Sequence, residues 1–155
     1  MDQEIVLTPA KYKELEAELE RLVTVERPAI AERIRQARAL GDLSENFDYQ
    51  DAKRQQGFLE GRIANVKAML ERAHITEYQT GGDTVGLGSH VTIHDEEFDE
   101  DIEYTIVGAP EADPASNRLS NTSPVGKALL GKKVGDTVEV PIPAGKAIYK
   151  VIEIR

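Results

Sequence analysis

The sequence contains no cysteine and no tryptophan, and only eight of its 155 residues are aromatic. Without cysteine the chain cannot form disulfides, cysteine-based zinc sites or thiolate nucleophiles, so we expect it to work in a reducing, cytoplasmic environment. No apolar run approaches the ~20 residues that cross a bilayer. The first nine residues also lack the basic and apolar regions of a signal peptide. These absences predict a soluble protein without a membrane partner.

Positive charge is also scarce, because 19 Lys and Arg face 28 Asp and Glu, for a formal net charge of −9. An acidic chain gains little from displacing counterions on a phosphate backbone, so free nucleic acid is not its expected primary ligand. A protein partner, or nucleic acid already held by a protein, remains open. The sequence contains no Walker-type loop, no dinucleotide-binding fingerprint and no local Ser-His-Asp signature.

The first half is dominated by helix-forming residues and predicts two long helices, at about residues 9–40 and 44–74. The second helix carries a coiled-coil seam with alternating steps of three and four residues: Tyr49, Ala52, Gln56, Leu59, Ile63, Val66, Leu70 and Ala73. In the first helix the seam jumps by eight residues from Leu22 to Ile30, with Pro28 inside the jump. Since proline removes a helical hydrogen bond, we expect a kink near Pro28 and a shifted register beyond it.

The two helices are joined by only a few residues, from Leu40 to Ser44. They must therefore run antiparallel as a hairpin. Gly41 suits the left-handed backbone that ends a helix. Each arm has ~30 residues, which at 1.5 Å per residue makes a rod about 45 Å long. Such a rod presents its tip, near residues 41–46, to whatever it is inserted into.

The second half has a different hydrophobic period. A linker at residues 77–82, which includes Thr80, is followed by alternating apolar and polar residues that predict β-strands. Ser123 and Pro124 mark the start of a short helix, and a hairpin turn is expected at residues 143–145. Seven acidic residues fall between the first two strands and predict a solvated acidic hairpin tip, Asp95 to Glu103.

The expected fold class is α+β. The N-terminal antiparallel α-helical coiled-coil hairpin is assigned to residues 1–76, and residues 77–82 form the linker. Residues 83–155 are expected to form a small antiparallel β-sheet with one short helix.

Asp42 and Glu45 at the hairpin tip have two interpretations. In the first, they form a capping box that satisfies free backbone amides at the start of the second helix. In the second, the two carboxylates share a divalent cation such as Mg²⁺, which accepts one or two carboxylates and completes its shell with water and substrate oxygens. Two carboxylates are too few to hold magnesium tightly, so the other ligands would come from another molecule.

Five basic residues lie within about three helical turns of the tip: Arg33, Arg35, Arg38, Lys53 and Arg54. Ordinary surface charge explains their presence. If the tip meets a phosphodiester, however, Arg38 and Lys53 are placed to hold the neighbouring backbone. Elsewhere, His90 and His94 share one face of a predicted strand, which is compatible with a metal pair, although surface histidines are the default interpretation.

Two stretches of the sequence resemble the signatures of one family. Residues 41–49 (GDLSENFDY), continued by residues 52–57 (AKRQQG), resemble the hairpin tip of bacterial GreA-type transcript cleavage factors, the GreA/GreB family. Residues 121–132 (NTSPVGKALLGK), followed by a Gly-Asp pair at 135–136, are similar to that family's C-terminal signature. The resemblance extends over nearly the whole chain.

The resemblance implies a coiled-coil hairpin and an FKBP-like C-terminal domain that docks at the rim of the RNA polymerase secondary channel. It implies that Asp42 and Glu45 are the catalytic tip acids, which help to hold a second Mg²⁺ jointly with the polymerase and orient the attacking water. The polymerase's own active site would then cleave backtracked nascent RNA, so the chain is a catalytic cofactor and not an enzyme. Arg38 and Lys53 match basic positions that face the RNA, and Tyr49 matches an aromatic position near the tip.

The implied partner is RNA polymerase, with nascent RNA and template contacted only inside the elongation complex. We expect a cytoplasmic monomer that holds no metal outside that complex. The acidic composition resembles the A type of factor, which favours release of short RNA fragments. Ser44 and Phe47 lie at variable positions and receive no role from the resemblance.

Other functions remain open. A Gre-fold inhibitor would occupy the same channel without promoting cleavage, but such inhibitors carry altered acidic tips, whereas Asp42 and Glu45 match the cleavage pattern. A coiled-coil protein-interaction module would use these two acids only as caps. An apolar tip favours that module, yet Leu43 and Phe47 are flanked by charge. Prolyl isomerase activity is less favoured, because the second half is poor in aromatics that would line a proline pocket.

Overall fold

The computed structural model describes residues 4–79 and 81–155 of the chain. Residues 1–3, and Thr80 of the expected linker, lie outside the described residues. None of the helices in these ranges is both long and apolar enough to cross a bilayer.

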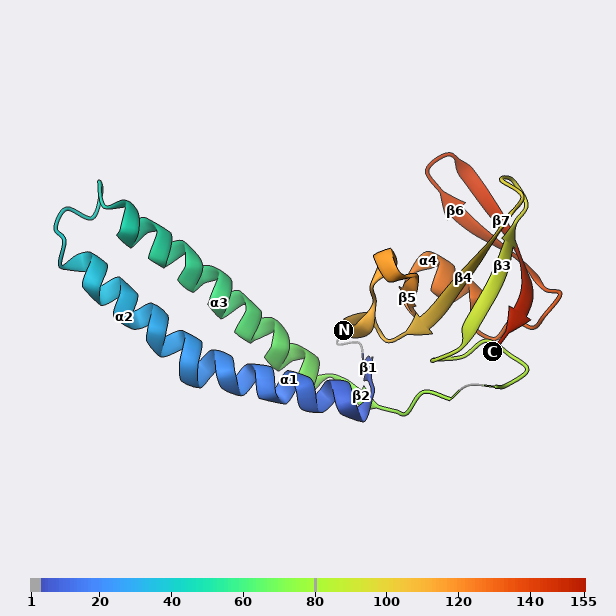
Figure 1. Cartoon of the computed structure of the whole chain (residues 1–155), viewed down its shortest axis with the longest axis horizontal. Coiled ribbons are helices and arrows are strands. Elements are labelled where there is room, and N and C mark those ends of the chain that lie inside the picture. The colour runs from blue at the N-terminus through green and yellow to red at the C-terminus, as the bar shows by residue number, and fades with distance from the viewer. Residues whose placement is uncertain (1–3, 80) are drawn as a thin grey trace. The chain divides into compact units, whose positions relative to one another are not determined.

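The chain divides into two compact units (Figure 1). The helical unit is Ala10–Ala73, and the sheet unit combines Glu4–Pro9 with His74–Arg155. The first described residues therefore belong with the C-terminal sheet, although the expected boundary assigned them to the hairpin.

The helical unit is a hairpin of two arms (Figure 1). Its first arm is made of α1 (Pro9–Arg21), the π-helical segment η1 (Leu22–Glu26) and α2 (Arg27–Arg38), and its second arm is α3 (Phe47–Glu71). The predicted pair of long helices is thus confirmed. Both helices end a few residues further from the tip than the sequence suggested.

The irregularity expected near Pro28 takes the form of η1. A π-helix uses i→i+5 hydrogen bonds and so takes up one more residue than an α-helix. This extra residue matches the eight-residue step of the seam from Leu22 to Ile30. Leu22 and Ile34, on either side of the step, are both buried. The first arm therefore shifts its register while it remains helical.

The seam of α3 is the face that is shielded from solvent, as the sequence predicted. Ala52, Ile63 and Val66 are buried, and the other five seam residues are partly buried. Gln56 is the one polar member of the seam and is partly buried. Burial of these apolar side chains against the first arm is the main source of stability for the hairpin.

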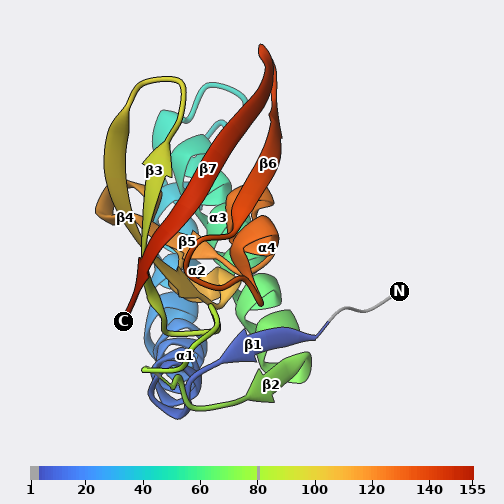
Figure 2. The same cartoon turned by 90° about the vertical axis from the view of Figure 1, so that its right-hand side faces the viewer.

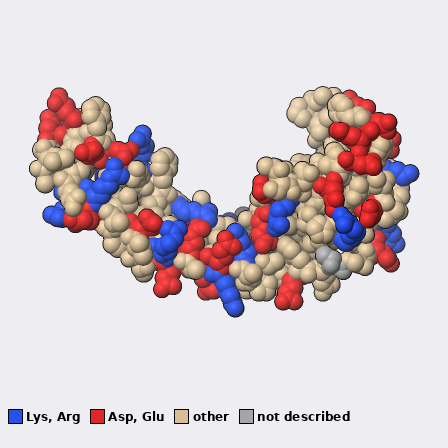
Figure 3. Space-filling model, in the orientation of Figure 1, with Lys and Arg blue, Asp and Glu red and all other residues tan. Residues whose placement is uncertain are grey.

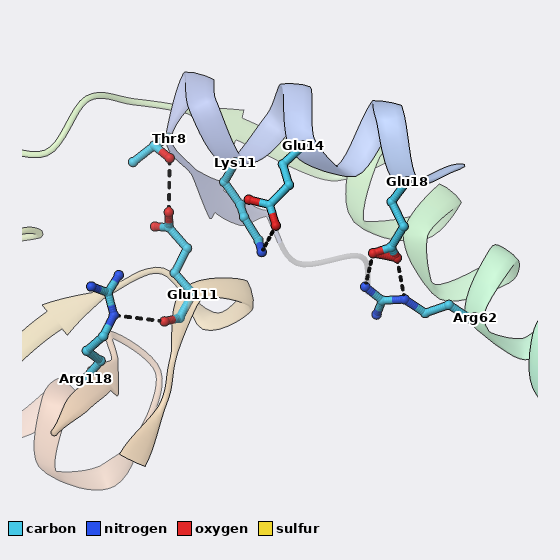
Figure 4. A network of polar contacts seen from close by, with 7 residues as sticks. All are labelled: Thr8, Lys11, Glu14, Glu18, Arg62, Glu111 and Arg118. Carbon is cyan, nitrogen blue, oxygen red and sulfur yellow. Dashed lines mark hydrogen bonds and ion pairs between the residues drawn. The ribbon is translucent and has the colours of Figure 1, made fainter. Parts of the chain in front are cut away.

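Two bidentate ion pairs also connect the arms. Arg62 of α3 binds both oxygens of Glu18 at 2.6 and 2.7 Å (Figure 4). Arg27 binds both oxygens of Glu60 at 2.7 and 3.0 Å. These side chains are only partly shielded from solvent, and solvent-accessible ion pairs contribute little to stability. The two ion pairs therefore determine how the arms are aligned more than they stabilise the hairpin.

The sheet unit has five strands in the order β5-β4-β3-β7-β6 (Figure 2). Their bounds are β3 (His90–Asp95), β4 (Glu100–Val107), β5 (Arg118–Ser120), β6 (Thr137–Ile142) and β7 (Gly145–Ile154). Three strand pairs are antiparallel, but β5 runs parallel to β4. The sheet is therefore mixed and not wholly antiparallel.

The parallel pair has a topological cause. The connection between β4 and β5 contains the two 3-10 helices η2 (Ala109–Glu111) and η3 (Pro114–Ser116). Parallel neighbours need a crossover connection, since a tight turn reverses the direction of the chain. This longer connection returns the chain so that β5 pairs with the last three residues of β4, Thr105 to Val107, and runs in the same direction.

The short helix α4 (Pro124–Leu129) completes the core of the sheet unit. Ser123 caps it as predicted, because its Oγ accepts a hydrogen bond from Gly126 N at 3.1 Å. Leu129 is fully buried and belongs to a cluster with seven residues from the sheet and its connections: Val85, Val91, Ile93, Ile106, Val138, Val140 and Val151. The hairpin turn between β6 and β7 also lies where the sequence predicted it.

The N-terminal strand is tied into the sheet unit. β1 (Ile5–Leu7) pairs with β2 (Ala73–Ile75) in a separate two-stranded sheet, visible in Figures 1 and 2. Thr8 Oγ1 donates to Glu111 Oε1 at 3.1 Å, and Arg118 Nε donates to the Glu111 carbonyl oxygen at 3.3 Å (Figure 4). Glu111 therefore connects segments that are far apart in the sequence.

Tyr78 also forms hydrogen bonds with Glu111 and with the turn that follows β4. Its hydroxyl donates to the Glu111 carboxylate and accepts from Gly108 N at 2.8 Å. Burial and the neighbouring Glu111 raise the pKa of Tyr78 to about 12, so the phenol stays protonated and can donate. A side chain at Gly108 would collide with the Val6 carbonyl oxygen. Glycine is therefore required where β1 approaches this turn.

Candidate functional site at the hairpin tip

The reversal between the two arms starts where α2 ends. Leu40 N donates to Ala37 O at 3.1 Å, and Gly41 N donates to Arg38 O at 3.2 Å. Gly41 has a φ of +113°, a conformation that side chains disfavour. Gly41 therefore ends the first arm, as the sequence predicted.

Asn46 joins the end of the first arm to the start of the second. Its Oδ1 accepts a hydrogen bond from Tyr49 N at 3.0 Å and so caps α3. Its Nδ2 donates to the carbonyl oxygen of Ala37 at 2.6 Å. Sequence patterns pointed to Asp42 as the cap, although asparagine directly before a helix is itself a strong N-cap signal. One side chain thus fixes both ends of the tip loop.

Asp42 does not cap α3. Its Oδ1 accepts from Ser44 N at 3.0 Å and from Ser44 Oγ at 2.8 Å, which forms a local turn. The capping-box interpretation of Asp42 and Glu45 is therefore wrong. The physical reason is that the turn after Gly41 continues through Ser44, so the helix begins later than the spacing suggested and Asn46 takes the cap position.

The tip carboxylates have oxygens that remain open. The two hydrogen bonds from Ser44 lower the pKa of Asp42, so its carboxylate is ionised at neutral pH. Asp42 Oδ2 and both Glu45 carboxylate oxygens accept no hydrogen bond within the described ranges. Asp42 is therefore oriented through one oxygen, while its other oxygen faces solvent together with Glu45.

A shallow hollow at the tip contains these acids, and its lining is Leu40, Asp42, Glu45, Asn46, Phe47 and Asp48. Asp48 was not singled out from the sequence. It lies in the first turn of α3, where the helix dipole favours a negative charge. Its position at the start of the predicted helix was the one feature of the sequence that could have identified it. Acidic groups are visible at this end of the helical unit in Figure 3. In the part of the chain that the structure describes, no three acidic or histidine side chains form a ready metal site.

Three of the five basic residues near the tip are held in ion pairs. Arg33 and Arg54 both bind Asp51, at 2.8 and 2.5 Å. Arg35 binds Glu32 at 2.5 Å on the same helix. For these three residues, the structure supports the interpretation of ordinary surface charge.

Arg38 and Lys53 differ from the other three, because neither forms an ion pair with any described residue. The Arg38 guanidinium lies 5.9 Å from the centre of the Tyr49 ring, within range of a cation–π interaction. Lys53 Nζ donates to the neutral side chain of Gln56 at 3.0 Å. Both side chains are exposed. The structure thus brings Arg38 and Tyr49 together and leaves two positive charges near the tip without a local counter-charge.

The histidines of the sheet unit do not form a metal pair. His94 Nδ1 lies 2.7 Å from Asp101 Oδ1, and its Nε2 lies 3.1 Å from Asp99 Oδ1. His90 instead pairs with Thr105 Oγ1 at 2.9 Å. The metal-pair interpretation is therefore wrong, because both ring nitrogens of His94 already face carboxylates.

The acidic segment of the sheet unit covers the turn between β3 and β4, but it extends further into the strands than expected, because Asp95 ends β3 and Glu100, Asp101 and Glu103 belong to β4. Acidic side chains are concentrated on this part of the sheet unit in Figure 3. Asp95 is the buried member of the group, and its Oδ1 accepts from Glu97 N at 2.9 Å and from Phe98 N at 3.2 Å. The other acids of the turn are exposed, which is typical of a solvated hairpin tip.

Two family models match this chain and together cover nearly all of it. The model described as "Transcription elongation factor, N-terminal" matches residues 5–75. The model described as "Transcription elongation factor, GreA/GreB, C-term" matches residues 79–155.

Individual proteins are similar over their full length. The transcription elongation factor GreA of Thermoanaerobacter pseudethanolicus is 53% identical over 156 residues, which cover 100% of this chain and 99% of that protein. The GreA of Clostridium acetobutylicum is 49% identical over 155 residues, with 99% and 98% covered. Among solved structures, GreA factor homolog 1 (Gfh1) of Thermus thermophilus is 31% identical over 99% of both chains, with a TM-score of 0.47.

Proposed function

The chain belongs to the GreA/GreB family of transcription elongation factors, and from this premise we propose that it stimulates RNA polymerase to cleave backtracked nascent RNA. In this proposal the hairpin enters the secondary channel and brings its tip to the polymerase active centre. The chain acts there as a catalytic cofactor and not as an independent enzyme.

One observation supports this role above the others, namely the arrangement of the carboxylates at the tip. Asp42 is ionised and oriented by Ser44, yet one of its oxygens stays open, and the Glu45 carboxylate accepts no hydrogen bond among the described residues. Acids used only as helix caps would be engaged with backbone amides of α3. In this chain that task belongs to Asn46. The open carboxylates are therefore available to another molecule.

The open carboxylate oxygens at the tip are suitable ligands for a Mg²⁺ ion whose other ligands come from a second molecule. Magnesium prefers oxygen ligands and is bound through one or two carboxylates together with water and substrate oxygens. Asp42 Oδ2 and the Glu45 carboxylate are the oxygens that would hold it, and the remaining ligands would come from the polymerase and the RNA. A second Mg²⁺ held in this way would supply the activation of water that phosphodiester hydrolysis requires.

The other tip residues bind and orient the RNA. The charges of Arg38 and Lys53 are not neutralised locally, so both can hold a phosphate of the extruded strand. Tyr49 lies under the Arg38 guanidinium and limits its movement. The Glu45 carboxylate can accept a hydrogen bond from the attacking water and so orient it.

The sheet unit provides the docking module in this proposal. Residues 83–155, with their own hydrophobic core, would bind the rim of the secondary channel, while the helical unit Ala10–Ala73 would supply the inserted hairpin. The factor would act in the cytoplasm, where transcription by its polymerase partner takes place. It would act as a monomer, because the apolar seam of α3 is already covered by the first arm of the same chain.

A cleavage assay on a stalled, backtracked polymerase complex tests the proposal. The complex carries labelled RNA and receives Mg²⁺ with wild-type protein, Asp42→Asn or Glu45→Gln, and Glu16→Gln on the exposed surface of α1 is the matched control. Asparagine at position 42 keeps the acceptor for Ser44 but loses the charge. We expect release of 3′ fragments to fall by about 100-fold or more in both tip variants and to stay unchanged in the control, with polymerase binding retained.

Two results would contradict the proposal. If wild-type protein slows elongation without releasing fragments, the chain is a channel inhibitor. If the tip variants cleave as well as wild type, the carboxylates have no catalytic role.

A further inference from the structure

Phe47 is the most exposed large hydrophobic side chain among the described residues, with 82% of its surface accessible to solvent. It is the first residue of α3. A phenylalanine this exposed contributes little burial to folding. Alanine is also a better helix former than phenylalanine, so the fold itself gives no reason for an aromatic ring at this position.

The surroundings of Phe47 are those of the proposed catalytic tip. Its side chain lines the same hollow as Asp42, Glu45 and Asp48. Tyr49, two residues further along the helix, lies on a different face and is half-buried beside Arg38. Phe47 is therefore the aromatic ring near the open carboxylates that is free to contact another molecule.

This combination of groups suits one class of ligand. An apolar protein surface packed on Phe47 would have to desolvate the neighbouring carboxylates without compensation, which is costly. A nucleotide instead offers a flat base for the ring, and its phosphate oxygens can share a cation with the carboxylates. The hollow thus matches an unpaired nucleotide better than a hydrophobic protein segment.

We propose that Phe47 stacks on an unpaired base of the extruded RNA and so helps to position the strand for cleavage. This inference rests on the function proposed above, and it adds a base contact to the roles of the tip acids. Stacking on an aromatic ring tolerates any base, so the contact would operate on all transcripts, and it would be strongest for the large faces of purines.

The test compares Phe47→Ala, Phe47→Leu and Phe47→Trp on backtracked complexes that differ only in the extruded nucleotide, which is a purine, a pyrimidine or an abasic residue. With a purine, we expect kcat/KM for cleavage to fall by about fivefold or more in the Ala and Leu variants, the loss expected from one base–aromatic stack. The Trp variant should retain the wild-type value. With the abasic residue, wild type and all three variants should become equal.

The controls separate the possible failures. Thermal unfolding of the free variants should match wild type, since the ring is exposed. The stacking inference is overturned if Phe47→Leu cleaves as well as wild type, or if Phe47→Ala loses as much activity with the abasic residue as with a purine. Either result would mean that Phe47 contacts protein, while the proposed role in cleavage would stand. If wild-type protein releases no fragments at all, in parallel with the inactive Asp42→Asn, the proposed function fails and the stacking inference fails with it.

Discussion

The side chain of Asn46 donates from Nδ2 to the carbonyl oxygen of Ala37 at 2.6 Å, which links the end of α2 to the start of α3. The same side chain caps α3 through Oδ1. The tip acids Asp42 and Glu45 lie in the loop between these two attachment points. Their position therefore depends on a residue that carries no charge and performs no chemistry.

Replacing Asn46 should damage cleavage more than stability. Asn46→Ala removes both bonds, whereas Asn46→Asp keeps the cap but loses the donor to Ala37. We expect the Ala variant to lose about 1–3 kcal/mol of stability, as for a lost cap plus one hydrogen bond. Urea unfolding measures that loss. Cleavage assays well below the melting temperature should show a lower maximal rate for both variants.

Asn65→Ala is the matched control for Asn46, because Asn65 is an exposed asparagine on the same helix. It should leave the cleavage rate unchanged and should not lower the stability, since alanine is the better helix former. The positioning role of Asn46 is refuted if its variants reach the wild-type cleavage rate at saturating protein.

Neutralising Arg38 or Lys53 should weaken cleavage without weakening the fold. Neither residue has a partner of opposite charge among the described residues. We expect Arg38→Gln and Lys53→Gln to lower kcat/KM about 10-fold or more each at low salt, as for one lost charge-assisted contact. The difference in kcat/KM between each variant and wild type should become smaller at high salt, because salt also weakens the attraction between these side chains and the RNA in the wild-type protein. Salt titration of the cleavage rate measures both effects.

Arg35→Gln provides the comparison for these two variants, since Arg35 lies about one helical turn from Arg38 in the last turn of α2 but is paired with Glu32. Its cleavage rate should equal that of wild type. An equal loss in all three variants would mean that general surface charge is responsible, and that Arg38 and Lys53 have no special role.

Repeating local patterns allowed much of this fold to be predicted. The seam of α3, the end of the first arm at Gly41 and the cap of α4 at Ser123 each depend on neighbouring residues, and each was found. The extra residue at Leu22–Glu26 was visible as a break in spacing. Its π-helical form was not, because the same break is compatible with a kink.

Features that depend on distant partners could not be read in the same way. The strand β5 has three residues and pairs in parallel with β4 only after a crossover. Thr8 and Glu111, which hold the N-terminal strand on the sheet unit, are 103 positions apart. At the tip, the resemblance indicated Asp42 and Glu45. The identity of the true helix cap depended on where the turn ended, which spacing alone could not give.

Replacing Gly57 or Gly61 by alanine should stabilise the helical unit. Both glycines lie inside α3, and a Cβ atom at either position would have no described atom within 4 Å. Alanine is favoured over glycine in helix interiors by about 1 kcal/mol. Each variant should therefore raise the free energy of unfolding by about that amount in urea titrations followed by circular dichroism. A decrease in stability would contradict this prediction and would mean that the helical unit requires glycine at these positions.

The ion pairs of His94 should make the stability of the sheet unit depend on pH. The hydrogen bond that His94 donates to the Asp101 carboxylate, and the charges of Asp101, Asp99 and Glu96, raise the pKa of His94 above its usual 6.5. A raised pKa in the folded state means that protonation favours folding. This contribution is therefore fully present below about pH 6.5 and is lost as the pH rises through the folded-state pKa. His94→Gln should remove it.

Two measurements check this prediction for His94. An NMR titration of the ring should give a pKa above that of an unfolded peptide, and unfolding at about pH 6 and pH 8.5 should show a smaller difference in His94→Gln than in wild type. His90→Gln is the control, because His90 on the same strand pairs with the neutral Thr105 hydroxyl. An unchanged pH dependence in His94→Gln would mean that solvent screens the three carboxylates and that the pairing contributes nothing to folding. Adding salt to wild type should have the same effect as the substitution, since the charges around His94 lie at the surface.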